Sequence, residues 1–141
     1  MSSEFERLKA DRKLTRERIT RAMVEKEVTA AESDLQDARD SLEAGKYKWA
    51  TIQGYYSMFH SARALLYSKG YREKSHHALL VAIRELFSKE LTPTLTDKFE
   101  DAMNLRQEAD YGLRFSQTGA KSVIVGAEEL LQATRSIRGI R

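Results

Sequence analysis

Residues 47–69, YKWATIQGYYSMFHSARALLYSK, decide the fold of this chain. One apolar stripe recurs along them at helical spacing and consists of Trp49, Ile52, Tyr56, Phe59 and Leu66. A second stripe lies beside it and consists of Tyr55, Met58, Ala62 and Leu65. Two adjacent stripes predict a helix buried on two sides, because a surface helix carries only one apolar face. We therefore expect a central helix that packs against its neighbours in the chain and against another subunit.

Helical periodicity continues on both sides of this segment. Upstream, apolar residues from Val24 to Leu42 are spaced 4, 3, 4, 3 and 4 apart. Downstream, we expect a short helix capped by Ser75, a helix with Pro93 in its first turn and a last helix through Ile137. The thinner spacing before residue 22 predicts a helix that starts after Ser2 or Ser3. No strand pattern of convincing length appears, so the predicted fold is all-α, an up-and-down bundle of four to five helices.

Length and composition indicate one domain that needs neither a metal nor a disulfide for folding. The 141 residues contain 24 Lys and Arg, 21 Asp and Glu, one proline and no cysteine. Thiolate chemistry and cysteine-based zinc sites are therefore excluded. No stretch approaches the roughly 20 apolar residues that span a bilayer, and residues 1–5 do not resemble a signal peptide, so we expect a cytoplasmic protein. We divide the chain into a basic, helical N-terminal extension, residues 1–23, and a bundle domain, residues 24–141.

The N-terminal extension concentrates positive charge. Residues 7–21 contain seven basic and two acidic side chains, a local charge of +5, whereas the whole chain carries +3. Such a segment suits phosphate or another anionic partner. No aromatic residue is interleaved to stack on bases, which favours a solvated helix face instead.

Arg106 stands on an apolar stripe, in the series Leu95, Phe99, Ala102, Arg106, Ala109 and Leu113. A guanidinium in that position needs an anion or a route to water. Asp110 follows one turn later and Tyr111 comes next, so a cation, a carboxylate and a phenol share one turn. Either a structural ion pair or an anion-binding site would satisfy this pattern.

Two further groups carry candidate chemistry. Tyr56, His60 and Arg63 share a helix face, where a neutral imidazole suits proton transfer and equally suits a hydrogen-bonded core position. Lys74 and His76 lie at a predicted helix N-terminus, which suits a phosphate or carboxylate and equally suits a solvated cap. The three histidines do not form a metal-ligand pattern, so we expect no metal site and no cofactor.

Three motifs together resemble one family. Residues 50–70 contain Tyr-Tyr-x-x-Phe-His, residues 74–76 read Lys-Ser-His, and residues 105–111 contain Arg-x-x-Ala-Asp-Tyr. This order over about residues 24 to 138 resembles the HEPN domain family of prokaryotes. The resemblance implies a helical bundle that commonly dimerises and is often encoded beside a minimal nucleotidyltransferase as a toxin–antitoxin pair.

The resemblance also bears on activity. Ribonuclease members of the family carry an arginine followed four to six residues later by a histidine at the dimer cleft, and cleave RNA without metal. Arg106 matches the arginine, but positions 111 to 113 are Tyr, Gly and Leu. Whether this chain is an enzyme therefore stays open.

Three functional hypotheses follow. The leading one is a homodimeric nucleotide- or RNA-binding module of a HEPN/nucleotidyltransferase system, with its cleft near Arg106, Asp110, Tyr111, Tyr56, Arg63, Lys74 and His76. The first alternative is a metal-independent endoribonuclease toxin that uses Arg106 with a non-standard base, for which His60 is the candidate. The second alternative is an interaction protein with a basic, nucleic-acid-binding arm.

Overall fold

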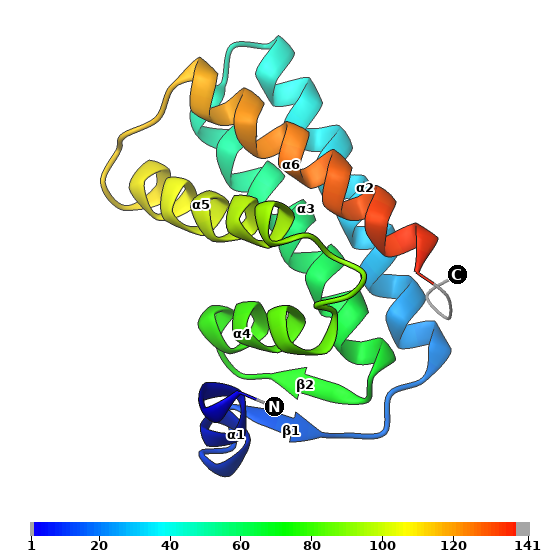
Figure 1. Ribbon diagram of the computed structural model, residues 1–141. Coiled ribbons are helices and arrows are strands. Elements are labelled where there is room, and N and C mark those ends of the chain that lie inside the picture. Colours follow the sequence, from blue (N-terminus) through cyan, green and yellow to red (C-terminus); the bar gives the residue numbers. More distant parts are fainter. Residues whose placement is uncertain (1, 138–141) are drawn as a thin grey trace.

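The computed structural model describes residues 2–137 and confirms the all-α bundle (Figure 1). Six helices and two short strands follow one another along these residues. They are α1 (Ser3–Ala10), β1 (Leu14–Arg16), α2 (Arg21–Glu43), α3 (Tyr47–Ser68), β2 (Tyr71–Glu73), α4 (His76–Leu86), α5 (Pro93–Asp110) and α6 (Gln117–Ser136).

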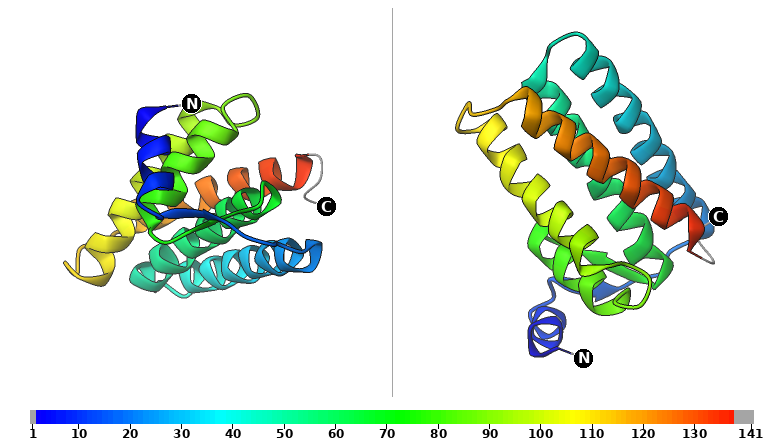
Figure 2. Two further views of the ribbon diagram at one scale, coloured as in Figure 1. Left: turned by 90° about the horizontal axis from the view of Figure 1, so that it is seen from below. Right: turned by 45° about the horizontal axis from the view of Figure 1, so that its top comes forward.

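Helix α3 is the centre of the molecule. It packs against α2, α4, α5, α6 and β2, and the views in Figure 2 show the other long helices gathered around it. Its second apolar stripe, which includes Tyr55 and Met58, is fully buried. The first stripe is buried at Phe59 and Leu66 but leaves Trp49 50% exposed, so the expected burial on two sides is only partly met within one chain. Within residues 2–137, α2 and α5 make no contact with each other, which leaves the sector of α3 between them uncovered. Packing against another subunit stays a prediction.

The helix boundaries follow from capping residues. The Ser75, Thr92 and Ser116 side chains accept hydrogen bonds from backbone N–H groups in the first turns of α4, α5 and α6. Gly70, at φ +81°, lets the chain leave α3 in the left-handed conformation that other residues adopt at a cost. The chain then turns directly into β2.

Close packing of α3 against α6 depends on a glycine. A Cβ atom added at Gly54 would lie 2.9 Å from Cγ1 of Val123 on α6, which is closer than carbon atoms approach one another. A side chain at residue 54 would therefore push α6 away from the central helix.

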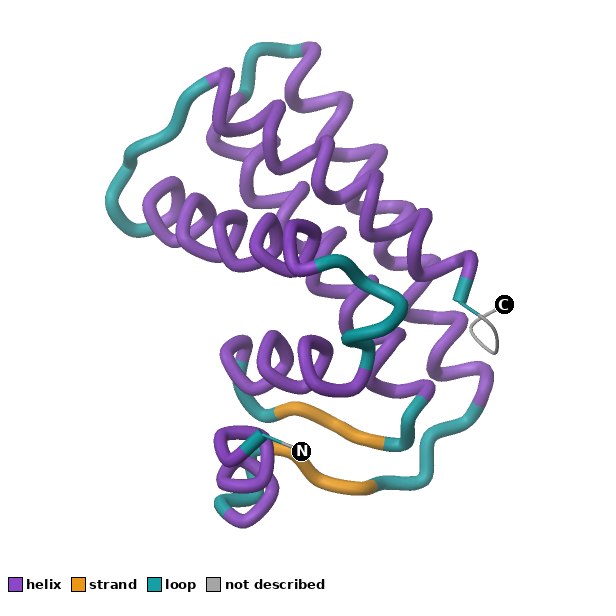
Figure 3. The backbone as a smooth tube through the Cα atoms, viewed as in Figure 1, coloured by secondary structure: helices purple, strands orange, loops and turns teal. Residues whose placement is uncertain are grey.

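The N-terminal segment differs from the single helix expected up to residue 22. Helix α1 ends at Ala10, Arg12 takes a positive φ of 59°, and β1 pairs antiparallel with β2 (Figure 3). Phe5 and Leu14 are buried in the bundle core, so the helical spacing across this segment was coincidental beyond α1. The partner of β1 lies more than fifty residues away in the sequence, where a local pattern cannot show it.

Part of the basic segment packs against its own domain. The Arg16 guanidinium lies 4.6 Å from the centre of the Tyr71 ring, and the Lys9 amine lies 5.5 Å from that of Phe5. Arg21 forms an ion pair of 3.1 Å with Glu25. These contacts explain several of the charges, and nucleic-acid binding by this segment stays a prediction.

Candidate functional site

Arg106 of α5 reaches into a cluster of tyrosine rings. Its guanidinium carbon lies 5.3 Å from the ring centre of Tyr55, 5.7 Å from that of Tyr56 and 5.9 Å from that of Tyr111. The side chain is only 10% exposed, which confirms its place on the buried stripe. Three aromatic faces around one guanidinium provide cation–π stabilisation without neutralising its charge.

The polar contacts of Arg106 are incomplete. Oδ2 of Asp110 lies 3.6 Å from Nη1, which is beyond hydrogen-bonding distance. The buried Nε atom has no hydrogen-bond partner in the described part of the chain. The Tyr55 hydroxyl supplies a further polar contact to this guanidinium. The unpaired Nε–H group costs stability and is the candidate donor to an anion.

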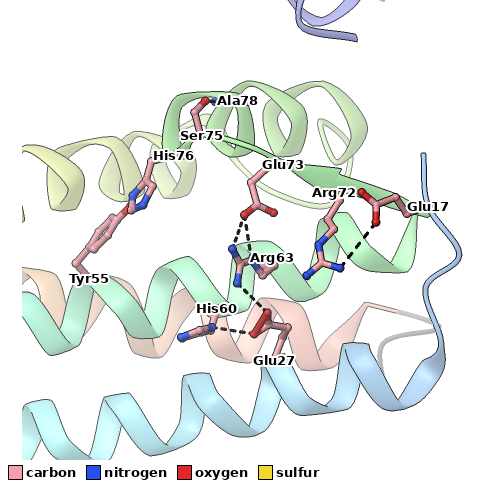
Figure 4. Close-up of polar contacts among 10 residues, drawn as sticks. All are labelled: Glu17, Glu27, Tyr55, His60, Arg63, Arg72, Glu73, Ser75, His76 and Ala78. Carbon is pink, nitrogen blue, oxygen red and sulfur yellow. Dashed lines mark hydrogen bonds and ion pairs between the residues drawn. The ribbon is translucent and has the colours of Figure 1, made fainter. Parts of the chain in front are cut away.

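His76 contacts the same two tyrosines. It is the first residue of α4, directly after the cap residue Ser75. Its Nδ1 atom forms a hydrogen bond with the Tyr55 hydroxyl (Figure 4). The imidazole also stacks on the Tyr55 ring, with centres 5.7 Å apart, and lies 4.6 Å from the ring centre of Phe59. Hydrogen bonding and stacking together fix the orientation of this ring.

The surroundings of His76 favour its neutral form. Burial and the positive charge of Arg106 lower the pKa of His76, and Arg63 adds to this, while the Glu73 carboxylate opposes it. Burial raises the pKa of Tyr55, so this hydroxyl stays protonated. The pair at neutral pH is therefore a phenol and a neutral imidazole.

A second polar cluster bridges α2, α3 and β2 (Figure 4). Nη2 of Arg63 lies 2.6 Å from Oε2 of Glu73, and Nη1 lies 3.2 Å from Oε1 of Glu27. Nδ1 of His60 lies 2.8 Å from Oε2 of Glu27, and Nε2 lies 3.5 Å from Oδ2 of Asp34. Both nitrogens of His60 thus face carboxylates of α2.

The charges in this second cluster stabilise one another. Burial acts to raise the pKa of Glu27, but the hydrogen bond and charge of His60, with the charge of Arg63, outweigh it and lower the pKa. Burial acts to lower the pKa of Arg63, but the hydrogen bond and charge of Glu73, together with Tyr67 and Glu27, outweigh it and raise the pKa. Arg63 is therefore a fully charged, well-paired structural cation.

The structure brings together most of the predicted site residues. Arg106, Asp110, Tyr111 and Tyr56 form one cluster, and His76 contacts the same rings. Arg63 and His60 belong instead to the second cluster, and no hydrogen bond, ion pair or ring contact joins His60 to Arg106 within residues 2–137. Lys74 is exposed, and its backbone N–H donates to the Lys13 carbonyl.

Sequence reasoning left two important residues out of the candidate site. Tyr55 belongs to the Tyr-Tyr-x-x-Phe-His motif, but only its neighbour Tyr56, which shares a helix face with His60 and Arg63, is among the candidates. Glu73 is 4% exposed, and its Oε1 atom has no hydrogen-bond partner in the described chain. Nothing local marks Glu73, since its pairing with Arg63 arises from the turn after α3.

No group of three or more histidine, aspartate or glutamate side chains in residues 2–137 could hold a metal ion. No described helix is long and apolar enough to cross a bilayer.

Comparison with known proteins identifies the family of this chain. Residues 24–137 match the HEPN domain, so the chain belongs to the HEPN domain family. A UPF0332 protein of Archaeoglobus fulgidus is 31% identical over 116 residues, covering 80% of this chain and 93% of the relative. The family suggested by the three motifs is therefore confirmed.

Two relatives from Methanocaldococcus jannaschii carry the name "Putative toxin". One is 34% identical over 62% of this chain and 61% of its own length, and the other is 32% identical over 72% and 78%. The fold is also similar to the crystal structure of TT1696 from Thermus thermophilus. That likeness has a TM-score of 0.69 at 16% identity and covers 79% of this chain and 95% of the other.

Proposed function

We propose that this HEPN domain protein is a homodimeric, toxin-type module that binds the phosphate of a nucleotide or RNA at Arg106. The observation that carries this proposal is the buried guanidinium whose Nε has no partner in the described chain and whose nearest carboxylate stands 3.6 Å away. A phosphate accepts several hydrogen bonds from one guanidinium, which no neighbouring side chain in residues 2–137 does here. The two relatives named as toxins support the same class of function.

The surroundings of Arg106 favour a ligand that carries a nucleobase. Tyr111 is 78% exposed, and its ring centre lies 5.9 Å from the guanidinium carbon of Arg106. Leu113 and Phe115 extend this apolar surface along the connection to α6. An exposed aromatic ring beside a cation suits a base and its phosphate together.

Calorimetric titration with ATP, GTP and a short single-stranded RNA tests this binding. We expect Arg106→Ala to weaken binding of the responsive ligand by about tenfold or more, because charged hydrogen bonds contribute roughly 1.5–3 kcal/mol. Arg84→Ala is the matched control, since Arg84 pairs with Asp97 and Glu100 away from the tyrosines. Absence of binding by the wild-type protein, or equal binding by Arg106→Ala, would contradict the proposal.

Dimerisation is supported by the uncovered sector of α3. Trp49 is 50% exposed there, and Tyr56 is half-buried beside Arg106. A second copy covering this sector would bury both rings and enclose the guanidinium. Light scattering at micromolar concentration should give twice the 16.2 kDa monomer mass, and a monomer would refute the dimer.

A minimal nucleotidyltransferase partner and a cytoplasmic location complete the proposal. Both rest on the family resemblance rather than on any contact in the structure. Expression of the chain alone should arrest growth, and co-expression of a nucleotidyltransferase encoded beside it should relieve the arrest. Growth arrest that persists when the nucleotidyltransferase is co-expressed would contradict the proposed partner.

Metal-independent RNA cleavage is the second candidate function. The specific observation in its favour is a histidine, His76, that shares the rings of Tyr55 and Tyr56 with Arg106. Such a reaction requires a cation for the phosphate and a group that accepts a proton. Arg106 provides the first of these.

A further inference from the structure

We propose that a cavity between α2, the C-terminal half of α3 and β2 binds the phosphate group of a small organic phosphomonoester. The cavity has a volume of about 390 Å³, and its described lining includes Lys26, Arg63, Tyr67 and Arg72. None of the residues that contact Arg106 lines it. The inference therefore concerns a second site and goes beyond the function proposed for Arg106.

Three cations from three elements converge on this cavity. The guanidinium carbons of Arg72 on β2 and Arg63 on α3 lie 5.4 and 5.8 Å from the centre of the Tyr67 ring. Figure 4 shows the Arg72 side chain extending from β2 beside that of Arg63. Lys26 lines the same cavity from α2. Concave surfaces lined by charges of one sign attract small ions of the opposite sign.

Two of these cations keep hydrogen-bond donors available. The Lys26 amine has no ion pair and no hydrogen bond among residues 2–137. Nη1 of Arg72 lies 3.8 Å from Oε1 of Glu17, which is beyond hydrogen-bonding distance, and both side chains are exposed. Arg63, in contrast, is engaged by Glu73 and Glu27 and forms part of the wall. The amine of Lys26 and the guanidinium of Arg72 are therefore the charged donors.

Tyr67 adds a neutral donor. The residue is 4% exposed and lines the cavity, yet its hydroxyl has no hydrogen-bond partner in the described part of the chain. Burial raises the pKa of Tyr67, so the phenol keeps its proton at neutral pH. Buried polar groups normally have a partner, and an anion in the cavity would accept the hydrogen bond that this hydroxyl can donate.

The acidic side of the cavity is already occupied. Glu27 is the one carboxylate among the described lining residues, against three cations. Its Oε1 atom accepts a hydrogen bond from Arg63, and its Oε2 atom lies 2.8 Å from Nδ1 of His60. Because both oxygens are engaged, Glu27 offers little to a bound cation. The lining retains an excess of two positive charges with His60 neutral.

The donor set and the size of the cavity favour an organic phosphate. Two unpaired cations and a hydroxyl match a dianion with three terminal oxygens better than they match a carboxylate. The volume of about 390 Å³ falls within the range of roughly 300–1,000 Å³ for small-molecule sites. Met23 and Ala30 provide apolar wall for the organic part of the ligand. A free phosphate ion would leave this wall without contact.

Phenyl phosphate is a suitable probe, because it joins a dianionic phosphomonoester to an apolar body. Phenyl sulfate has a similar shape and carries one negative charge fewer, and inorganic phosphate lacks the apolar body. Titration of the isotope-labelled full chain, followed by amide NMR shifts, locates the site. We expect shifts in α2 around Lys26 and in β2 around Arg72, with binding about fivefold or more tighter than that of phenyl sulfate or inorganic phosphate.

Substitutions identify the donors. Lys26→Gln and Arg72→Gln each remove one available cation and should weaken binding of phenyl phosphate by about fivefold or more. Tyr67→Phe keeps the ring beside Arg72 and removes only the hydroxyl, which should weaken binding by about threefold or more. Lys121→Gln is the matched control, because Lys121 is an exposed lysine of α6 that does not line the cavity.

Arg106→Ala separates this site from the one in the proposed function. The variant should still show the phenyl phosphate shifts around Lys26 and Arg72, whether or not the wild type also binds the probe at Arg106. A wild-type protein without shifts, or with shifts confined to the residues around Arg106, would overturn the inference. Equal binding at the cavity by Lys26→Gln, Arg72→Gln and the wild type would do the same. Binding abolished by Arg106→Ala and unaffected by Lys26→Gln would support the proposed function alone.

Discussion

Arg63 and Arg106 are two shielded arginines in opposite situations. Arg63 makes contacts of 2.6 and 3.2 Å with Glu73 and Glu27, and its guanidinium stacks 4.6 Å from the Phe59 ring centre. Arg106 has three tyrosine rings around it, a carboxylate at 3.6 Å and an Nε without a partner in the described chain. Arg63 is paired with two carboxylates, whereas Arg106 retains an N–H group without a partner in the described chain.

The difference between the two arginines shows where an incompletely paired charge lowers the stability of the fold. A buried ion pair that loses one partner leaves an uncompensated charge, whereas an unpaired buried cation already carries that cost. Arg63 should therefore be required for folding, and Arg106 should be dispensable for folding and required for binding. Four substitutions test this contrast.

Arg63→Met should have the largest effect on stability. It leaves Glu73, which is 4% exposed, without its cation, and the cost of breaking a buried pair is about 3–5 kcal/mol. Denaturant unfolding measures the change. A loss below about 1 kcal/mol would show that water replaces the guanidinium and that Arg63 is not structural.

Glu27→Gln should have an intermediate effect, because it weakens two charged hydrogen bonds, to His60 and Arg63, for about 1–3 kcal/mol. The pKa of Glu27 is lowered from 4.5 on folding, so the carboxylate stabilises the fold above that pH. This contribution is lost as the pH falls through the lower, folded-state value. Melting temperatures from about pH 7 to pH 3 should fall more steeply for the wild type than for Glu27→Gln, and parallel curves would contradict the assignment.

Arg106→Met should change stability by less than about 1 kcal/mol, in either direction. Replacing an incompletely paired buried cation by an apolar side chain of similar length is often neutral or stabilising, and a thioether packs well on aromatic rings. The same unfolding experiment measures it beside Arg63→Met. A cost as large as that of Arg63→Met would remove the contrast between the two arginines.

Asp110→Asn should have the smallest effect on stability, below about 0.5 kcal/mol, because the 3.6 Å contact is half-exposed and weak. It should nevertheless tighten binding of RNA, since it removes a negative charge beside the phosphate position. Titration at two salt concentrations checks this, because the gain should shrink at higher salt. Weaker binding by Asp110→Asn would instead assign the aspartate to ligand contact.

The sequence allowed most of the bundle and only part of the site to be predicted. Capping residues such as Ser75 and Thr92, the apolar stripes and the place of Arg106 act within one or two turns, so their consequences are local. The strand β1, the Arg63–Glu73 pair and the contact of His76 with Tyr55 join residues distant in sequence. Such pairings depend on how the elements meet, which spacing along one helix does not show.

The pairing of β1 with β2 has a consequence for where the chain can be truncated. The region shared with the family begins at residue 24, after β1, yet the register sets Leu14 opposite Glu73 and so helps to hold the carboxylate that faces Arg63. Fragments cut at the family boundary would lose the strand that covers one edge of β2 and would release the start of α4. The match to the family therefore leaves out a strand that pairs with the segment carrying Glu73, and we expect residues 14–16 to stabilise the position of that carboxylate.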